Sequence, residues 1–275
     1  MGLGMRPLEQ RPAATLAGTP KVFRLFEIAC VVAFPPMWIS LLVRTWRSFE
    51  TPSFTLLAVI AGSLTSDFIS GIFHWFFDTW FTPDTPFIGR SFVRTFREHH
   101  VDPTAICRHD FVETNGSNIF SGCVLVTAGY CVSGAFCAAS LLFAAVFMSL
   151  TSQIHKWAHA DRVPPVVAVL QKTRLILPRR AHALHHVAPF SRNYCITSGW
   201  LNEPFHQTRF FVVLEHVIST LTGAVPRRDD TATVFSERGN VDSDARVVVS
   251  TAQERFVNER TRDFGGIAAD ASDQR

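Results

Sequence analysis

The chain has 275 residues, of which 47% are hydrophobic and 18% are charged, whereas soluble domains carry about 25% charged residues. A net charge of +3 is too small to indicate a polyanionic partner, so we expect no binding to nucleic acid. The six cysteines include no CxxC pair, which argues against a disulfide-stabilised secreted domain and against a thiolate zinc site. The composition predicts an all-α integral membrane protein.

The first half of the chain contains the segments long enough to cross a bilayer. Residues 1–20 are polar and predict a flexible N-terminal segment without the apolar core of a signal peptide. The apolar segment 22–46 is long enough to cross a hydrocarbon core of about 30 Å, and Pro35-Pro36 should kink it. A second span begins near Phe54 and ends in an aromatic cluster at 73–81, which is typical of an interfacial belt.

The third apolar stretch, 119–150, is either one long span or a hairpin of two short spans that turns near Ser133-Gly134. The later segments 163–178 and 210–223 are too short to cross, so they predict amphipathic helices on the membrane surface. Residues 231–275 are polar and predict a disordered tail. The folded membrane domain is therefore expected to cover 21–230.

Positive charges predict the orientation of the spans. Arg6, Arg11, Lys21 and Arg24 lie before or at the start of the first span, whereas only Arg44 and Arg47 lie at its end. This difference favours a cytosolic N-terminus. If all histidine clusters lie on one face of the membrane, the stretch 119–150 must cross twice. The sequence then predicts about four transmembrane helices with a cytosolic helical cap that carries the histidines.

Eleven histidines occur in the chain, and eight of them form clusters beside apolar segments. On a helix, positions i, i+3 and i+4 share a face, so His155 and His159 should aim at one point. The three histidines of the HALHH segment should do the same. Adjacent His99 and His100 diverge by about 100° on a helix and suit two different metals. The eight clustered histidines are His74, His99, His100, His155, His159, His182, His185 and His186.

Imidazole ligands suit zinc, copper, iron and nickel, and eight are too many for one metal. The sequence therefore predicts a two-metal site. His206 and His216 are interpreted as half-buried polar groups rather than ligands. Ionisable groups inside a span are functional candidates by default, and Asp67 precedes His74 by one heptad in the second span.

Four segments carry a family resemblance. They read SDFISGIFHWFFDTW, FREHHVDPTAICRHDFVETNGSN, QIHKWAH and LPRRAHALHHVAP with YCITSGWLN after it. These segments closely resemble the Kua-type lipid desaturase family, and the resemblance covers about residues 54–230. It implies an O2-dependent di-iron desaturase of the endoplasmic reticulum that converts the sn-1 alkyl ether chain of a phospholipid to a vinyl ether, as in plasmalogen biosynthesis. It also implies that the eight clustered histidines hold two iron ions and that cytochrome b5 or a similar carrier supplies electrons.

Further groups are predicted around the metals because a ligating histidine usually donates its other N–H to a carboxylate, a carbonyl or water. The candidates for this outer shell or for substrate contact are Asp78, Glu98, Asp102, His109 and Asn115. Basic residues such as Arg97 and Arg108 are candidates for attracting a phospholipid headgroup or an acidic electron donor, or for simple positive-inside anchoring. Two positions depart from the animal members of the family, which have histidine where this chain has Ala181 and Phe190.

Two alternatives to ether-lipid desaturation remain at this point. The chain could be an acyl-lipid desaturase or hydroxylase, since a plant plastid relative acts on a palmitoyl chain of phosphatidylglycerol and lacks the same two histidines. A histidine-rich metal transporter is the alternative from another class, but only the second span offers ionisable groups within the membrane. A catalytically inactive scaffold is disfavoured because all eight histidines are present.

Overall fold

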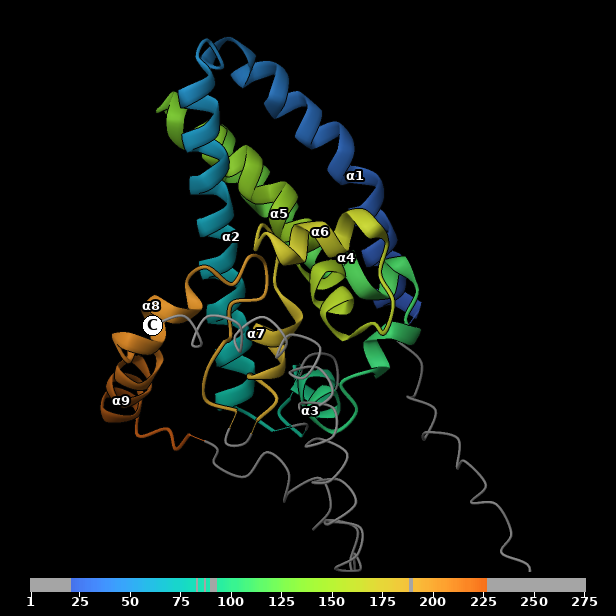
Figure 1. Ribbon diagram of the computed structural model, residues 1–275, viewed down its shortest axis with the longest axis vertical. Coiled ribbons are helices and arrows are strands. Elements are labelled where there is room, and N and C mark those ends of the chain that lie inside the picture. The colour runs from blue at the N-terminus through green and yellow to red at the C-terminus, as the bar shows by residue number, and fades with distance from the viewer. Residues whose placement is uncertain (1–20, 83, 87, 90–92, 188–189, 227–275) are drawn as a thin grey trace, which may run out of the picture.

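A computed structural model describes residues 21–226 except 83, 87, 90–92 and 188–189. The segments predicted to be flexible or disordered, 1–20 and 231–275, lie outside the described residues. The described part contains helices and no strand, as predicted. Its long helices stand together in the upper part of Figure 1, and short helices gather around their lower ends.

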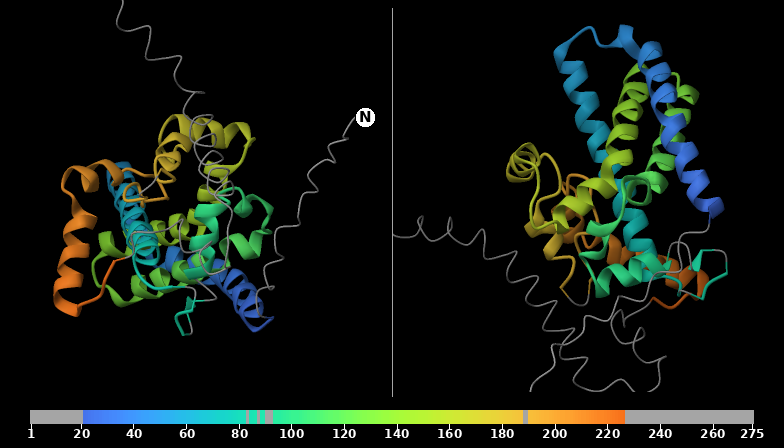
Figure 2. Two further views of the ribbon diagram at one scale, coloured as in Figure 1. Left: turned by 90° about the horizontal axis from the view of Figure 1, so that it is seen from below. Right: turned by 90° about the vertical axis from the view of Figure 1, so that its right-hand side faces the viewer.

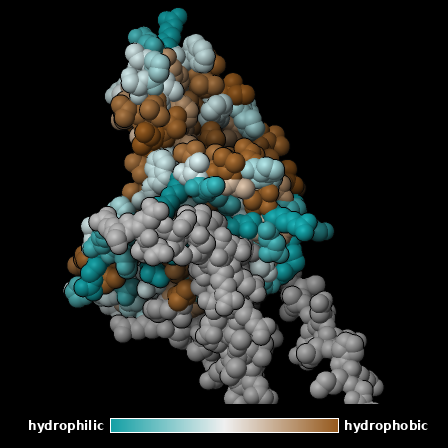
Figure 3. Space-filling view, viewed as in Figure 1, coloured by the Kyte–Doolittle hydropathy of each residue, from teal (hydrophilic) through white to brown (hydrophobic). Residues whose placement is uncertain are grey.

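Among the described residues, three helices are long and apolar enough to cross a membrane. The first is α1 (Lys21–Thr45) with the short helix η1 (Trp46–Ser48), and α1 continues through Pro35 and Pro36. The second is α2 (Pro52–Thr79), and the third is α5 (Ala135–His159). Figure 3 shows hydrophobic side chains gathered over the upper part of the molecule, where these helices stand.

The apolar stretch 119–150 is not one continuous helix but a helical hairpin that turns near Ser133-Gly134, where the second of the two predicted arrangements placed its turn. Helix α4 (Phe111–Cys131) ends at a three-residue connection, 132–134, and α5 follows. α4 begins before the apolar stretch because Asp110 caps it: the carboxylate accepts the Glu113 N–H at 2.9 Å and a hydrogen bond from Arg24 at 2.6 Å.

Helices α1 and α4 run side by side in the same direction. Their first residues meet at the Arg24–Asp110 ion pair, and their last turns meet where Arg44 donates to the carbonyl of Tyr130 at 2.8 Å. α4 therefore extends as far along the bundle as α1, although polar residues near its beginning keep it outside the set of three apolar helices.

Helices α2 and α5 approach closely at Gly62. A Cβ atom at this position would lie 2.7 Å from the Cβ of Phe143 and 2.8 Å from the backbone nitrogen of Ala144. Small residues permit such approaches between membrane helices. This contact sets the distance between α2 and α5 at this level of the bundle.

We expect Gly62→Ala to lower the stability of the bundle by about 1–3 kcal/mol, because the added methyl group overpacks the contact. Thermal unfolding in detergent measures the effect. Gly134→Ala is the matched control, since a Cβ there meets nothing closer than the Cys137 sulfur at 3.7 Å. Equal midpoints for the two variants would contradict the assigned contact.

Short helices of the described part surround the lower ends of the bundle (Figure 2). They are α3 (Arg94–Val101), η3 (Ala105–Arg108), α6 (Pro165–Lys172), α7 (Arg179–Ala183), α8 (Asn202–Gln207) and α9 (Phe210–Thr222). The two segments predicted to form surface helices contain α6 and α9. Phe211 of α9 packs with Trp75, Trp80 and Tyr194, whereas Val213 and Leu221 on the same helix are exposed.

Arg97 of α3 is buried, so its interpretation as a surface cation for a headgroup or an electron donor is wrong. Its guanidinium donates to the carbonyls of Asp78 at 2.8 Å and Phe77 at 3.0 Å. A cation suits the C-terminal end of a helix, where carbonyls lack intrahelical donors. Arg97 thus ties α3 to the lower end of α2.

Candidate metal centre

The eight clustered histidines come together at the lower ends of α2 and α5, in two neighbouring groups. We call the first the five-histidine group; its imidazoles come from α3, α5 and the region of α7, and it comprises His99, His155, His159, His182 and His186. We call the second the Asp78 group; it comprises His74, Asp78, His100 and His185. Within each group the candidate ligand atoms lie within 4.8 Å of one another.

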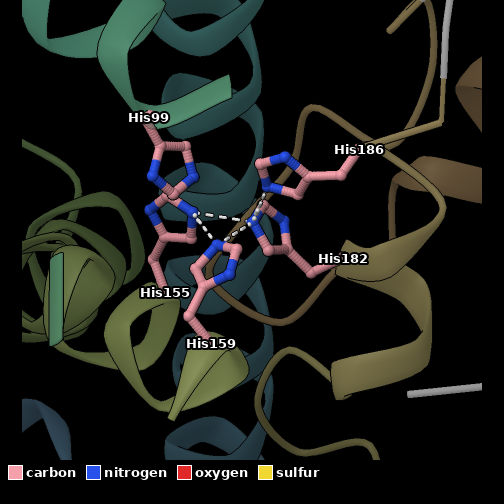
Figure 4. A group of neighbouring side chains, drawn as sticks. All are labelled: His99, His155, His159, His182 and His186. Atoms are coloured by element: carbon pink, nitrogen blue, oxygen red, sulfur yellow. Dashed lines mark hydrogen bonds between the residues drawn. The ribbon is translucent and has the colours of Figure 1, made fainter. Parts of the chain in front are cut away.

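His182 lies at the centre of the five-histidine group (Figure 4). Its Nε2 is 2.7 Å from the Nε2 atoms of His155 and His159, and 3.0 Å from that of His186. A neutral imidazole has one donor and one acceptor nitrogen, so one Nε2 cannot form ordinary hydrogen bonds with three others at once. Converging nitrogen lone pairs of this kind form a site for a cation.

Asp78 lies at the centre of the second group. Its Oδ2 is 3.4 Å from the Nε2 of His74 and that of His185, and 3.5 Å from that of His100. His74 and Asp78 are four residues apart on α2, so their side chains share a face of this helix. The Asp78 group therefore offers three imidazoles and one carboxylate, whereas the other group offers imidazoles alone.

Burial determines the charge state of this centre. Seven of the eight histidines and Asp78 are buried, and His99 is half-buried. Burial, with the neighbouring histidines adding to it, holds the pKa of His99, His182 and His186 well below the usual value. These imidazoles are neutral at physiological pH, which is the state that binds metals.

The residues present fit a pair of bound cations. Neither carboxylate oxygen of Asp78 has a hydrogen-bond partner among the described residues, and the same holds for Nε2 of His99. A buried acceptor without a donor costs about 1–3 kcal/mol or more. A cation bound by these atoms removes that cost.

Two backbone carbonyls set the orientation of imidazoles in the Asp78 group. Nδ1 of His74 donates to the carbonyl of Tyr194 at 3.0 Å, and Nδ1 of His185 donates to the carbonyl of Arg192 at 2.9 Å. Because a carbonyl only accepts, each ring must carry its proton on Nδ1. The Nε2 lone pairs are thereby directed toward Asp78.

The spacing arguments were correct for two of the three clusters. His99 and His100 diverge into different groups, and His155 and His159 share one group, as predicted. The prediction that the HALHH histidines aim at one point is wrong for His185, which joins the Asp78 group. The reason is that α7 ends at Ala183, so helical spacing does not continue to His185.

The residues predicted to surround the metals or to contact substrate do not all lie beside the histidines. Asp78 contacts the imidazoles directly rather than supporting them from behind. The side chain of Glu98 lies outside the described residues. Asp102 is at the surface, where it accepts from Thr104 and pairs with Arg108 at 2.7 Å.

The remaining two candidates have their described contacts on α4 and α5. His109 lies 3.8 Å from Glu113, and its carbonyl accepts from Lys156. Asn115 is fully buried and donates to Gln153 at 3.3 Å. Their roles next to metal or substrate remain predictions.

Of the two positions that depart from animal family members, Phe190 borders the centre. Its ring stacks on His100 with 4.7 Å between centroids and 18° between planes, and the residue is buried with a positive φ of 58°. Ala181 adjoins His182, and its carbonyl accepts from Asn193 at 2.7 Å. Sequence spacing gave no indication of the stacking of Phe190, since the two rings come from segments 90 residues apart.

Comparison with known proteins places the chain in a family. The model of the lipid desaturase domain matches residues 63–229. Plasmanylethanolamine desaturase of Myxococcus xanthus is 41% identical over 82% of this chain and 83% of its own length. Plasmanylethanolamine desaturase 1 of Mus musculus is 44% identical over 69% and 73%, respectively.

A plant protein is more distant: the chloroplastic fatty acid desaturase 4 of Arabidopsis thaliana is 33% identical over 62% of this chain and 54% of its own length. No solved structure matches the chain. The matched domain covers more than half of the chain and contains every histidine of both groups. The chain therefore belongs to the lipid desaturase family and is an oxidoreductase.

Proposed function

We propose that this protein desaturates the sn-1 alkyl ether chain of a plasmanyl phospholipid and thereby forms the vinyl ether of a plasmalogen. The observation that carries the proposal is the pair of buried histidine groups in a chain 41% and 44% identical to two plasmanylethanolamine desaturases. A C–H bond of an alkyl chain is too inert for a side-chain acid or base. The reaction therefore needs a redox metal, and the two groups supply ligands for two.

We infer that the two metals are iron ions. Neutral imidazole and carboxylate ligands both suit iron. The five-histidine group would hold one ion and the Asp78 group the other. When bound, the pair supplies the O2-dependent, two-electron chemistry that removes one hydrogen from each of two adjacent carbons.

The chain itself contributes the geometry and the exclusion of water. The carbonyls of Tyr194 and Arg192 hold two imidazoles in the tautomer that presents Nε2. The ring of Phe190 covers one side of His100. Asp78 gives its group one formal negative charge that the five-histidine group lacks, so the two sites differ in electrostatic potential.

We propose four transmembrane helices, α1, α2, α4 and α5, with the metal centre on the cytosolic side. α2 and α5 both end at the centre, because His74 and Asp78 lie in the last turns of α2 and His159 ends α5. If both cross the membrane, α4 must return the chain to the far side. Its extent beside α1 supports this crossing.

The endoplasmic reticulum is the proposed location, and cytochrome b5 or a similar one-electron carrier is the proposed donor. A cytosolic centre would be accessible to such a carrier. A phospholipid substrate is supported by the family and by the apolar helices that reach the centre from the membrane.

Vinyl ether lipid in cells that lack plasmanyl desaturase tests the function. We expect acid-labile vinyl ether lipid to appear with the intact chain and to stay absent with His185→Ala at equal protein level. No vinyl ether lipid, despite iron-loaded protein and a compatible electron donor, would exclude the ether-lipid assignment. New double bonds in acyl chains would then identify the protein as an acyl-chain desaturase, which would agree with the name of the plant relative, fatty acid desaturase 4.

A further inference from the structure

A buried carboxylate outside both histidine groups anchors a loop that reaches the metal centre. Asp67 lies on α2 about two turns before His74 and is fully buried. Its Oδ1 accepts the backbone N–H groups of Thr197, Ser198 and Gly199 at 2.9–3.2 Å, and its Oδ2 accepts that of Leu201 at 3.1 Å. The 192–202 loop is thus wrapped around one side chain.

The same loop makes further contacts, including those of the Thr197 hydroxyl with Ser66 at 3.1 Å and with Thr151 at 2.7 Å. The Asn202 side chain accepts the Cys195 N–H and donates to the Cys195 carbonyl, both at 2.9 Å. Ser70, one turn after Asp67 on α2, accepts the N–H of Ile196 at 3.3 Å. Gly199 supplies the positive φ of 75° that the loop needs to present three successive N–H groups to Asp67.

The other end of this loop orients two imidazoles. The carbonyls of Arg192 and Tyr194 accept from His185 and His74, and both histidines belong to the Asp78 group. Asp67 and His74 lie on the same helix, α2. Because Asp67 holds the loop at a fixed position along this helix, it also sets the position of the Tyr194 carbonyl relative to the His74 imidazole.

We propose that Asp67 is a positioning residue for the metal of the Asp78 group, acting through the 192–202 loop. The inference rests on the proposed two-iron function. Without the carboxylate, four backbone N–H groups lose their acceptor. Only hydroxyl contacts, those of Ser66 and Ser70 on α2, then hold this part of the loop to the helix, so we expect the loop to shift relative to α2. Groups that orient ligating histidines typically change metal affinity or activity by about 10- to 100-fold.

The test is the number of iron ions bound by purified full-length protein in detergent, with Asp67→Asn as the variant. Asparagine keeps one oxygen for the three donors but turns its NH2 group toward the Leu201 N–H. We expect one iron to bind about 10- to 100-fold more weakly, so that at limiting free iron the count falls from two to one. Mössbauer spectra should lose the same signal that Asp78→Asn removes.

Glu27→Gln is the matched control. Glu27 is another buried carboxylate on a membrane helix, and Ser117 of α4 donates to it at 3.4 Å. This variant should keep both irons and an unchanged Mössbauer spectrum. A general loss of stability would lower both irons together, whereas a positioning role removes one signal selectively.

Loss of both irons in Asp67→Asn, or of neither, would overturn the inference, provided that the variant elutes as the wild type does. Asp67→Leu, which removes all four acceptor contacts, should lose the same iron more completely. Wild-type protein that holds two irons but makes no vinyl ether would refute the proposed function. The iron count of the Asp67 variants would still decide whether Asp67 positions the metal of the Asp78 group. Wild-type protein without two bound metals would refute both.

Discussion

His182→Ala should abolish desaturation, with a loss greater than about 100-fold, beyond the range typical of groups that only support a ligand. The Nε2 of His182 is within 3.0 Å of three other imidazole nitrogens. No other side chain of the five-histidine group can therefore supply a nitrogen at this central position. Removing its ring also leaves a cavity among buried polar atoms. Vinyl ether lipid per unit of protein in desaturase-deficient cells measures the effect.

His206→Ala is the matched control for this variant. His206 lies on α8, is exposed, and belongs to neither histidine group. We expect its activity to remain within about twofold of wild type, since surface substitutions seldom alter a distant site. Substantial activity in His182→Ala would show that the five-histidine group does not hold a catalytic metal.

Asp78→Ala should have an effect of similar size, for an electrostatic reason. Asp78 supplies the negative charge at the centre of its group, where three imidazole nitrogens approach Oδ2 at 3.4–3.5 Å. Without it, a divalent cation loses an oxygen ligand and its charge compensation in a buried site. We expect one of the two irons to be lost and activity to fall by more than about 100-fold, measured by metal analysis and by lipid product.

Asp102→Ala separates this role from a general need for acidic residues near the histidines. Asp102 is only two residues after His100 in the sequence, yet its carboxylate is at the surface and pairs with Arg108. We expect two bound irons and activity near wild type. An Asp78→Ala protein that still holds two irons would show that Asp78 is not a ligand.

Local helical geometry made much of the centre predictable from the sequence. The i, i+4 pairs His74–Asp78 and His155–His159 lie within single helices, so their side chains had to share a face. The divergence of His99 and His100 follows from the same geometry. The hairpin between α4 and α5 was one of two arrangements that the apolar pattern allowed.

Contacts between distant segments were not predictable in this way. His185 left its expected group because α7 ends before it, and no strong stop signal marks that end in the sequence. The sequence places Asp67 on the same helix as His74 but does not indicate what its carboxylate binds. The loop that it binds is about 130 residues further along the chain. The burial of Arg97 depends on the close approach of α3 to α2.

The order in which the ligands leave the ribosome constrains how the centre is assembled. Its side chains come from segments that begin at residue 74 and end at residue 186, and the loop that aligns two of them closes only at residue 202. Synthesis of α2 and α5 is therefore finished before either group can be complete. If the two groups hold iron as proposed, iron loading has to follow the synthesis of His186, and chains truncated before His182 should lack both complete groups.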